Sequence, residues 1–254
     1  MSASDKLIGL VGFPLGHSFS NRYFTEKFQK EGIEGFSHRN FEIQSVNDLS
    51  KLLSQEPRLI GLNVTIPLKQ AIIPLLHELD STAEEIGAVN TIRIRGGRLK
   101  GFNTDYYGFQ ESLKQWLGDK ITCLNKALIL GTGGASRAIK VALEDLDIVP
   151  QYVSRHPQEN EMSYNSLKAS PDLLHEYPLI INCTPLGTFP DIEQKPDIPY
   201  GSVSSNHWLY DLVYNPAETA FLNAGRKQGA QIKNGLQMLH LQADKSWEIW
   251  NGTI

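Results

Sequence analysis

The 254-residue sequence contains few cysteines, no long apolar run and no cluster of basic residues. Its two cysteines, Cys123 and Cys183, lie far apart, which argues against a disulfide framework and indicates reduced thiols. No apolar run approaches the roughly 18 residues that cross a bilayer, and residues 1–6 lack the apolar core of a signal peptide. These absences predict a cytoplasmic protein that does not bind a membrane.

The net charge of −4 is small, and no run of Lys or Arg is present. The charge therefore gives no electrostatic basis for binding nucleic acid. The cysteines also lack the spacing of metal ligands, so we expect no metal site. A small molecule is the expected partner, with the chain acting as a monomer or a homodimer.

The first half of the chain alternates predicted strands and helices, as in a mostly parallel α/β sheet. The predicted helices are one through Phe24 and Phe28, one over 46–53, and one through Leu79 with a break near Pro74. The predicted strands cover residues 7–11, 38–43, 59–65, 88–95 and 99–102.

The end of the third predicted strand carries polar residues in an apolar segment. Asn63 and Thr65 interrupt the strand, Pro67 suits the first position of a helix, and Lys69 follows two residues later. Strand-to-helix corners are where α/β proteins bind ligands. The alternative for Lys69 is a surface lysine in the first helical turn.

Hydroxyl and carboxyl side chains precede two other predicted helices. Ser18 and Ser20 are either helix N-caps or donors to an anionic group of a ligand at a helix start. Asp105, just beyond the strand 99–102, is either an N-cap or a functional acid. Spacing alone does not separate these alternatives.

A second unit is predicted to begin near residues 120–126. The strand 127–130 leads into Gly131, Gly133 and a helix over 136–146, which is the context of a dinucleotide-binding loop. Gly131 permits the tight turn and Gly133 lets a pyrophosphate approach the backbone at the helix N-terminus. The alternative is an ordinary turn between a strand and a helix.

The next predicted strand, 151–154, ends where the ribose of a dinucleotide would lie. It ends in Ser154 and Arg155 without an acid, and a guanidinium suits a 2′-phosphate, so NADP is favoured over NAD. The alternative is a solvated surface arginine. Strands at 179–183 and 208–214 would place Thr184 and Tyr214 near the cofactor or its substrate.

Eight motifs in order resemble the shikimate dehydrogenase family. They extend from the first strand almost to the end of the chain: Gly12-x-Pro14-x-x-His17-Ser18-x-Ser20, Asn63-Val-Thr-Ile-Pro-x-Lys69, Gly87-Ala-Val-Asn-Thr91, Gly101-x-Asn-Thr-Asp105-x-x-Gly108, Gly131-x-Gly-Gly-Ala-x-Arg-Ala138, Asn182-x-Thr-Pro-Leu-Gly187, Asp211-x-x-Tyr-x-Pro216 and Gly235-Leu-x-Met-Leu-x-x-Gln242.

The resemblance implies reversible NADP-dependent reduction of 3-dehydroshikimate to shikimate in chorismate biosynthesis. It implies a substrate domain of residues 1–103 plus 237–254 and a Rossmann-like, doubly wound domain of residues 104–236. Lys69 and Asp105 would be the catalytic pair. The other substrate-binding residues would be Ser18, Ser20, Asn63, Thr65, Asn90, Tyr214 and Gln242. The cofactor-binding residues would be Gly131, Thr132, Gly133, Gly134, Ala135, Ser154, Arg155, Thr184, Leu212 and Gly235.

Five positions depart from the family pattern. Asn21 replaces a proline, Ser154 replaces an asparagine, His156 replaces a threonine, Thr188 replaces a methionine, and the basic residue usual shortly after Arg155 is absent. Cofactor preference is therefore expected to rest on Arg155 alone. The alternatives are a quinate/shikimate dehydrogenase with broader substrate or NAD use, and a non-catalytic shikimate sensor.

Overall fold

The computed structural model describes residues 6–15 and 19–252, and the chain divides into two compact units. Unit 1 comprises Met1–Thr104 and Ala243–Ile254, and unit 2 comprises Asp105–Gln242. The last helix, α9 (Leu236–Asn251), begins in unit 2 and ends in unit 1. The predicted functional boundaries, at residues 103/104 and 236/237, stay a prediction.

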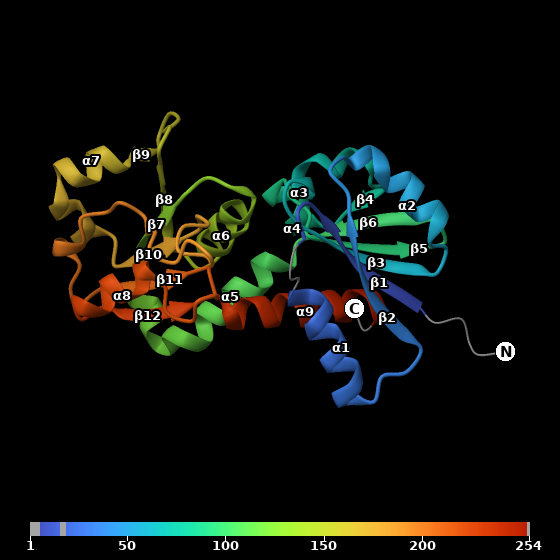
Figure 1. The fold of residues 1–254 in the computed structure, drawn as a ribbon. Coiled ribbons are helices and arrows are strands. Elements are labelled where there is room, and N and C mark those ends of the chain that lie inside the picture. The colour runs from blue at the N-terminus through green and yellow to red at the C-terminus, as the bar shows by residue number, and fades with distance from the viewer. Residues whose placement is uncertain (1–5, 16–18, 253–254) are drawn as a thin grey trace. The chain divides into compact units, whose positions relative to one another are not determined.

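Unit 1 contains a mixed six-stranded sheet in the order β2-β1-β3-β5-β6-β4 (Figure 1). The pairs β1/β2, β1/β3 and β4/β6 are parallel, whereas β3/β5 and β5/β6 are antiparallel. The strands are β1 (Lys6–Gly12), β2 (Phe36–Glu42), β3 (Leu59–Val64), β4 (Glu78–Leu79), β5 (Thr91–Arg95) and β6 (Arg98–Phe102).

Helices cover both faces of this sheet because side chains alternate along its strands. Leu7 of β1 packs with α2 (Leu49–Gln55), α3 (Leu68–Ala71) and α4 (Ser81–Ile86) on one face. Ile8 packs on the other face with Phe24 of α1 (Phe19–Glu31) and Trp250 of α9. Unit 1 is therefore a three-layer α/β unit.

Unit 2 contains a six-stranded sheet in the order β12-β11-β10-β7-β8-β9, and all its pairs are parallel. The order runs outward from β7 in both directions, which is the Rossmann arrangement with its switch point between β7 and β10. The strands are β7 (Lys126–Leu130), β8 (Val149–Ser154), β9 (Met162–Ser163), β10 (Leu179–Asn182), β11 (Trp208–Asp211) and β12 (Gln231–Asn234).

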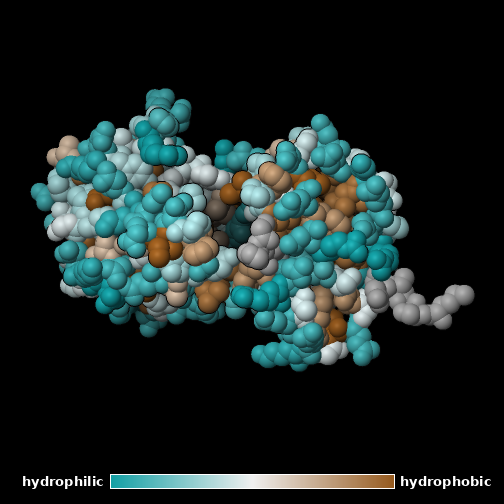
Figure 2. Space-filling model, in the orientation of Figure 1, coloured by the Kyte–Doolittle hydropathy of each residue, from teal (hydrophilic) through white to brown (hydrophobic). Residues whose placement is uncertain are grey.

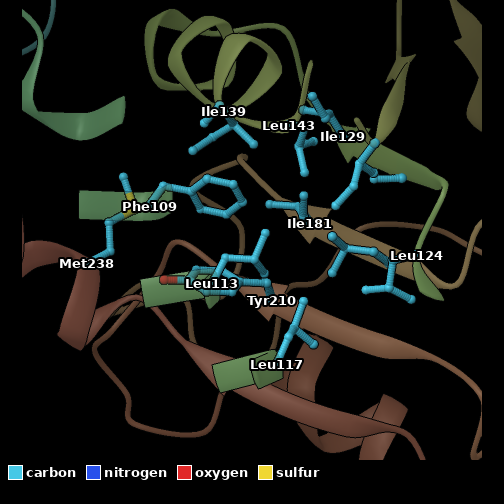
Figure 3. Close-up of a cluster of buried hydrophobic side chains, with 14 residues drawn as sticks. Phe109, Leu113, Leu117, Leu124, Ile129, Ile139, Leu143, Ile181, Tyr210 and Met238 are labelled. Carbon is cyan, nitrogen blue, oxygen red and sulfur yellow. The ribbon is translucent and has the colours of Figure 1, made fainter. Parts of the chain in front are cut away.

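The core of unit 2 also has two halves. Figure 3 shows one half, in which α5 (Thr104–Leu117) and α6 (Gly134–Glu144) pack side chains onto Ile129, Ile181 and Tyr210 of the sheet. The opposite face is covered by α7 (Tyr164–Ala169) and α8 (Ala220–Lys227). Together the two units confirm the predicted α/β fold class.

Two details of the α3 region in unit 1 differ from the prediction. The helix expected through Leu79 is wrong: α3 ends at Ala71, a 3₁₀ helix covers Ile73–Leu75, and Leu79 lies in β4. Pro74 cannot donate to a continuing helix, and the chain there pairs with β6 instead. Pro67 is the N-cap of α3 and not its first helical residue.

The face shown in Figure 2 is largely hydrophilic, with hydrophobic residues scattered among polar ones. Among the described residues, no helix combines the length and the apolar character required to cross a membrane.

Candidate functional site

The corner between β3 and α3 is anchored by backbone hydrogen bonds on both sides. The amide of Thr65 donates to the carbonyl of Val11 (2.9 Å), and the amide of Leu68 donates to the carbonyl of Thr65 (2.9 Å). The carbonyl of Lys69 accepts from the amide of Val89 (2.8 Å). Lys69 is half-buried, so the structure does not leave it as a fully exposed surface lysine.

Asn63 lies one residue before the end of β3, and only the nitrogen of its side-chain amide has hydrogen-bond partners. Its Nδ2 donates to the carbonyl of Asn90 (3.3 Å), Thr91 Oγ1 (3.1 Å) and Ser246 Oγ (2.9 Å). Its Oδ1 is buried without a hydrogen-bond partner, and the residue is 5% exposed. Leaving a buried acceptor unpaired costs about 1–3 kcal/mol, so this oxygen indicates a ligand that supplies a donor.

Asn90 is joined to Asn63 through β5 and the start of α5. The carbonyl of Asn90 accepts from the amide of Val64 (2.8 Å), and its Oδ1 accepts from the amide of Thr104 (2.6 Å). Asn63, Thr65, Lys69 and Asn90 therefore belong to one corner of unit 1.

Three buried hydroxyl residues complete this corner, and the sequence analysis did not identify them. Ser246 Oγ lies 2.8 Å from Thr91 Oγ1 and 3.2 Å from Thr104 Oγ1. They hold the amide of Asn63 in one orientation. The available signal was polarity at positions of otherwise apolar elements: Thr91 at the start of β5, and Ser246 directly before the core residue Trp247 of α9.

Of the two predicted carboxylate-binding serines, the structure describes Ser20, at the start of α1. Ser20 is the second residue of that helix and half-buried, so its N-cap alternative is wrong. Ser18 lies outside the described residues.

The other three predicted substrate residues belong to unit 2. Asp105 is buried in the first turn of α5, one residue inside the helix, so the N-cap alternative is wrong for it too. One turn later, a Cβ on Gly108 would lie 3.0 Å from Gln242 Cβ, which shows how closely α5 approaches α9. Gln242 is buried and its Nε2 donates to the carbonyl of Leu239 (2.9 Å). Tyr214 is 37% exposed on the loop after β11.

The glycine loop follows β7, at the switch point of the unit 2 sheet. Gly131 has φ +100°, a conformation that other residues rarely adopt, and its amide donates to the carbonyl of Val153 (2.9 Å). Tyr152 Oη donates to the carbonyl of Ser136 (3.2 Å) in the first turn of α6. Burial raises the pKa of Tyr152 to about 12, so this donor stays protonated at neutral pH.

The space in front of Gly133 fits a pyrophosphate. Gly133 is the N-cap of α6 with an extended backbone, and a Cβ built there would meet no protein atom within 4 Å. Thr132, Gly134 and Ala135 complete this turn, where unpaired helix amides favour an anion. The residues present therefore fit a dinucleotide.

The remaining predicted cofactor residues surround the same edge of the sheet. Ser154 ends β8, is buried and accepts from the amide of His156 (3.2 Å), while Arg155 between them is exposed. A Cβ on Gly131 would lie 2.9 Å from Thr184 Cγ2, so the loop after β10 packs on the glycine loop. A Cβ on Gly235 would lie 2.1 Å from the carbonyl oxygen of Leu212.

Residues 10–92 match the family model described as shikimate dehydrogenase substrate binding domain. The chain is 35% identical to the shikimate dehydrogenase (NADP(+)) of Methanococcus maripaludis strain C6, over 99% of this chain and 94% of that protein.

Solved structures match over nearly the whole chain as well. The shikimate 5-dehydrogenase of Thermus thermophilus, in complex with NADP(H) and shikimate, has a TM-score of 0.84 at 30% identity, covering 97% of this chain and 94% of that one. The quinate dehydrogenase of Corynebacterium glutamicum, in complex with NAD, has a TM-score of 0.85 at 26% identity, covering 98% and 94%.

Proposed function

This chain belongs to the shikimate dehydrogenase family, and we propose that it catalyses the reversible NADP-dependent reduction of 3-dehydroshikimate to shikimate. The similarity over nearly the whole of both this chain and the Methanococcus protein is the observation that carries the proposal. Two features of the site support it. One is the unpaired Oδ1 of Asn63 in unit 1 and the other is the open space at Gly133 in unit 2.

Asn63 and Lys69 are proposed to act on the substrate from the corner of unit 1. The Nδ2 of Asn63 already has three protein acceptors within hydrogen-bond distance. Its Oδ1 is therefore the atom that accepts from a substrate hydroxyl. Lys69 protonates the carbonyl oxygen as negative charge develops on it, and takes that proton back in the reverse direction. Asp105 assists as the partner carboxylate of this acid–base step. Ser18, Ser20 and Tyr214 hold the substrate carboxylate, and Thr65, Asn90 and Gln242 bind its hydroxyls.

The glycine loop and the loops after β8, β10 and β11 are proposed to hold NADP. The bound cofactor supplies or accepts the hydride. Gly133 and the first turn of α6 bind its pyrophosphate through backbone amides, and Arg155 binds its 2′-phosphate. A single exposed guanidinium gives a smaller preference for NADP over NAD than two cations would.

A second candidate is a quinate/shikimate dehydrogenase with broader substrate or NAD use, and the absence of a second basic residue after Arg155 favours the NAD use. The deciding experiment measures initial rates of nicotinamide reduction with shikimate or quinate, each with NADP or NAD. We expect the highest kcat/KM for shikimate with NADP. A higher kcat/KM for quinate with NAD would support the second candidate. Calorimetric binding of shikimate with no nicotinamide reduction in any combination would identify a sensor.

A further inference from the structure

Asp211, the last residue of β11, is a buried acid whose two carboxylate oxygens are both occupied by neutral donors. Its side chain has no exposed surface. Its Oδ1 accepts from Asn182 Nδ2 (2.9 Å) and the amide of Val213 (3.0 Å), and its Oδ2 accepts from Thr219 Oγ1 (2.5 Å). No ion pair to this carboxylate occurs within residues 6–15 and 19–252.

The three donors belong to three different segments at the carboxyl edge of the sheet. Asn182 ends β10, and its Oδ1 accepts from both the amide (3.0 Å) and the hydroxyl (2.6 Å) of Thr184. Val213 is the second residue of the loop after β11. Thr219 is the N-cap of α8 and accepts from the amide of Leu222 (3.3 Å). One carboxylate therefore connects both loops with a helix start.

These loops also touch the glycine loop and its surroundings. Thr184, oriented by Asn182, is the residue whose Cγ2 limits the space beside Gly131. Leu212, next to Asp211, presents its carbonyl to Gly235 at a distance that excludes any side chain there. A shift of the Asp211 network would therefore be transmitted to the proposed cofactor-binding residues.

The ionised carboxylate of Asp211 does not stabilise the folded protein. Burial raises the pKa of Asp211 to about 6, although hydrogen bonds from Thr219, Val213 and Asn182 oppose the increase. Because the folded pKa lies above the ordinary value, ionisation weakens folding as pH rises through about 6. Groups kept charged at the expense of stability are typical of functional sites. The neighbouring titratable groups, Cys183 and Tyr200, have raised pKa values and stay neutral at pH 7.

We propose that Asp211 is a positioning residue for the cofactor, acting through Asn182 to fix Thr184 and through its own backbone to fix Leu212. This inference rests on the proposed function, because it assigns those two residues to NADP binding. Asp211 itself is not expected to touch the cofactor.

Asp211→Asn tests the proposal with little change in volume. An amide group in place of the carboxylate leaves at least one of the three donors without an acceptor. We expect the calorimetric Kd and the KM for NADP to rise about 10-fold or more, because a hydrogen bond to a charged group contributes about 1.5–3 kcal/mol. We expect kcat to change much less. Asp191→Asn, which removes the same charge from an exposed loop, should leave both constants unchanged.

A second variant distinguishes positioning from general destabilisation. Asn182→Ala removes the link to Thr184 but leaves Asp211 its other two donors. Because Asp211 acts on Thr184 through Asn182 in this proposal, the double variant should bind NADP little more weakly than the weaker-binding single variant. The proposal would be overturned if the double variant raised Kd by the product of the two single-variant increases. An unchanged Kd in folded Asp211→Asn would also overturn it. Parent protein that binds NADP without reducing it would refute the proposed function and leave the role of Asp211 standing.

Discussion

Lys69 carries the clearest expectation for a single side chain. Lys69→Ala should lower kcat by about 10²–10⁴-fold, which is the usual contribution of general acid–base assistance. Calorimetric NADP binding and the thermal unfolding midpoint should stay close to those of the parent protein. Lys51→Ala, which removes an exposed lysine from α2 in the same unit, is the matched control. Near-normal turnover of Lys69→Ala would exclude the lysine from the mechanism.

Arg155 is the residue that we propose to select NADP over NAD. Arg155→Ala should raise the KM for NADP by about 10-fold or more, because an arginine–phosphate hydrogen bond is charge-assisted. The KM for NAD, which has no 2′-phosphate, should change little. The ratio of kcat/KM for the two cofactors is the measurement, with Arg98→Ala as a surface control in unit 1. An unchanged ratio of kcat/KM would show that Arg155 does not produce the preference for NADP.

Asn63 shows how far the sequence alone could go at this scale. A polar residue in an apolar strand was enough to predict a ligand-binding position. The free Oδ1 was not predictable, because its orientation depends on Ser246, which lies 183 residues away in sequence. The role of Asp211 was not predictable either, because the donors to its carboxylate come from three separate segments of the chain.

At the scale of elements, the close approach of α9 to β3 depends on one glycine. A Cβ on Gly61 would lie 2.2 Å from Trp250 Cδ1, and Trp250 Nε1 donates to the carbonyl of Ile92 (3.0 Å). Trp250 therefore has little freedom to move aside. Its position also sets that of Ser246, one turn earlier on α9.

Gly61→Ala should lower the free energy of unfolding by about 1–3 kcal/mol, as overpacking of a core does. Chemical denaturation followed by tryptophan fluorescence measures this change. Gly201→Ala is the control, because a Cβ there meets no atom within 4 Å. Equal stability of the two variants would contradict the tight packing of α9 on β3.

Element types were predicted correctly where the apolar pattern was uninterrupted, as in the buried strands β7 and β10 and the amphipathic helix α6. The prediction failed around Leu79, because a two-residue strand is defined by its partner β6 and not by its own sequence. The two-residue β9 was not predicted for the same reason, and the edge strand β12 was not predicted because only one of its four residues is apolar.

For the whole molecule, His38, a half-buried residue of β2 whose two ring nitrogens are buried, makes stability depend on pH. The His38 ring stacks on Phe24 with centroids 5.3 Å apart, and neither of its nitrogens has a hydrogen-bond partner. Burial lowers the pKa of His38 from 6.5 to about 4. The unfolded chain therefore binds a proton more readily between these pH values, and stability falls as pH decreases through them.

His38→Phe should remove this dependence and keep the ring stack. We compare the free energy of unfolding of the variant with that of the parent protein at each pH. This difference should shift in favour of the variant by up to about 3 kcal/mol between pH 7 and pH 4. Denaturation curves at both pH values provide the test. His175→Gln, at an exposed position of unit 2, should show no such gain. The same gap between parent and His38→Phe at both pH values would show that His38 does not titrate as its burial requires.

The path of α9 also bears on the order in which the molecule is completed on the ribosome. Unit 2 is continuous in sequence, whereas the core of unit 1 needs Trp247 and Trp250, which are synthesised after all of unit 2. The first 104 residues therefore leave the ribosome with Phe24 and Phe28 lacking their final neighbours. Although its sequence comes first, unit 1 is the part that closes its core last, and the nascent chain exposes that apolar face until α9 arrives.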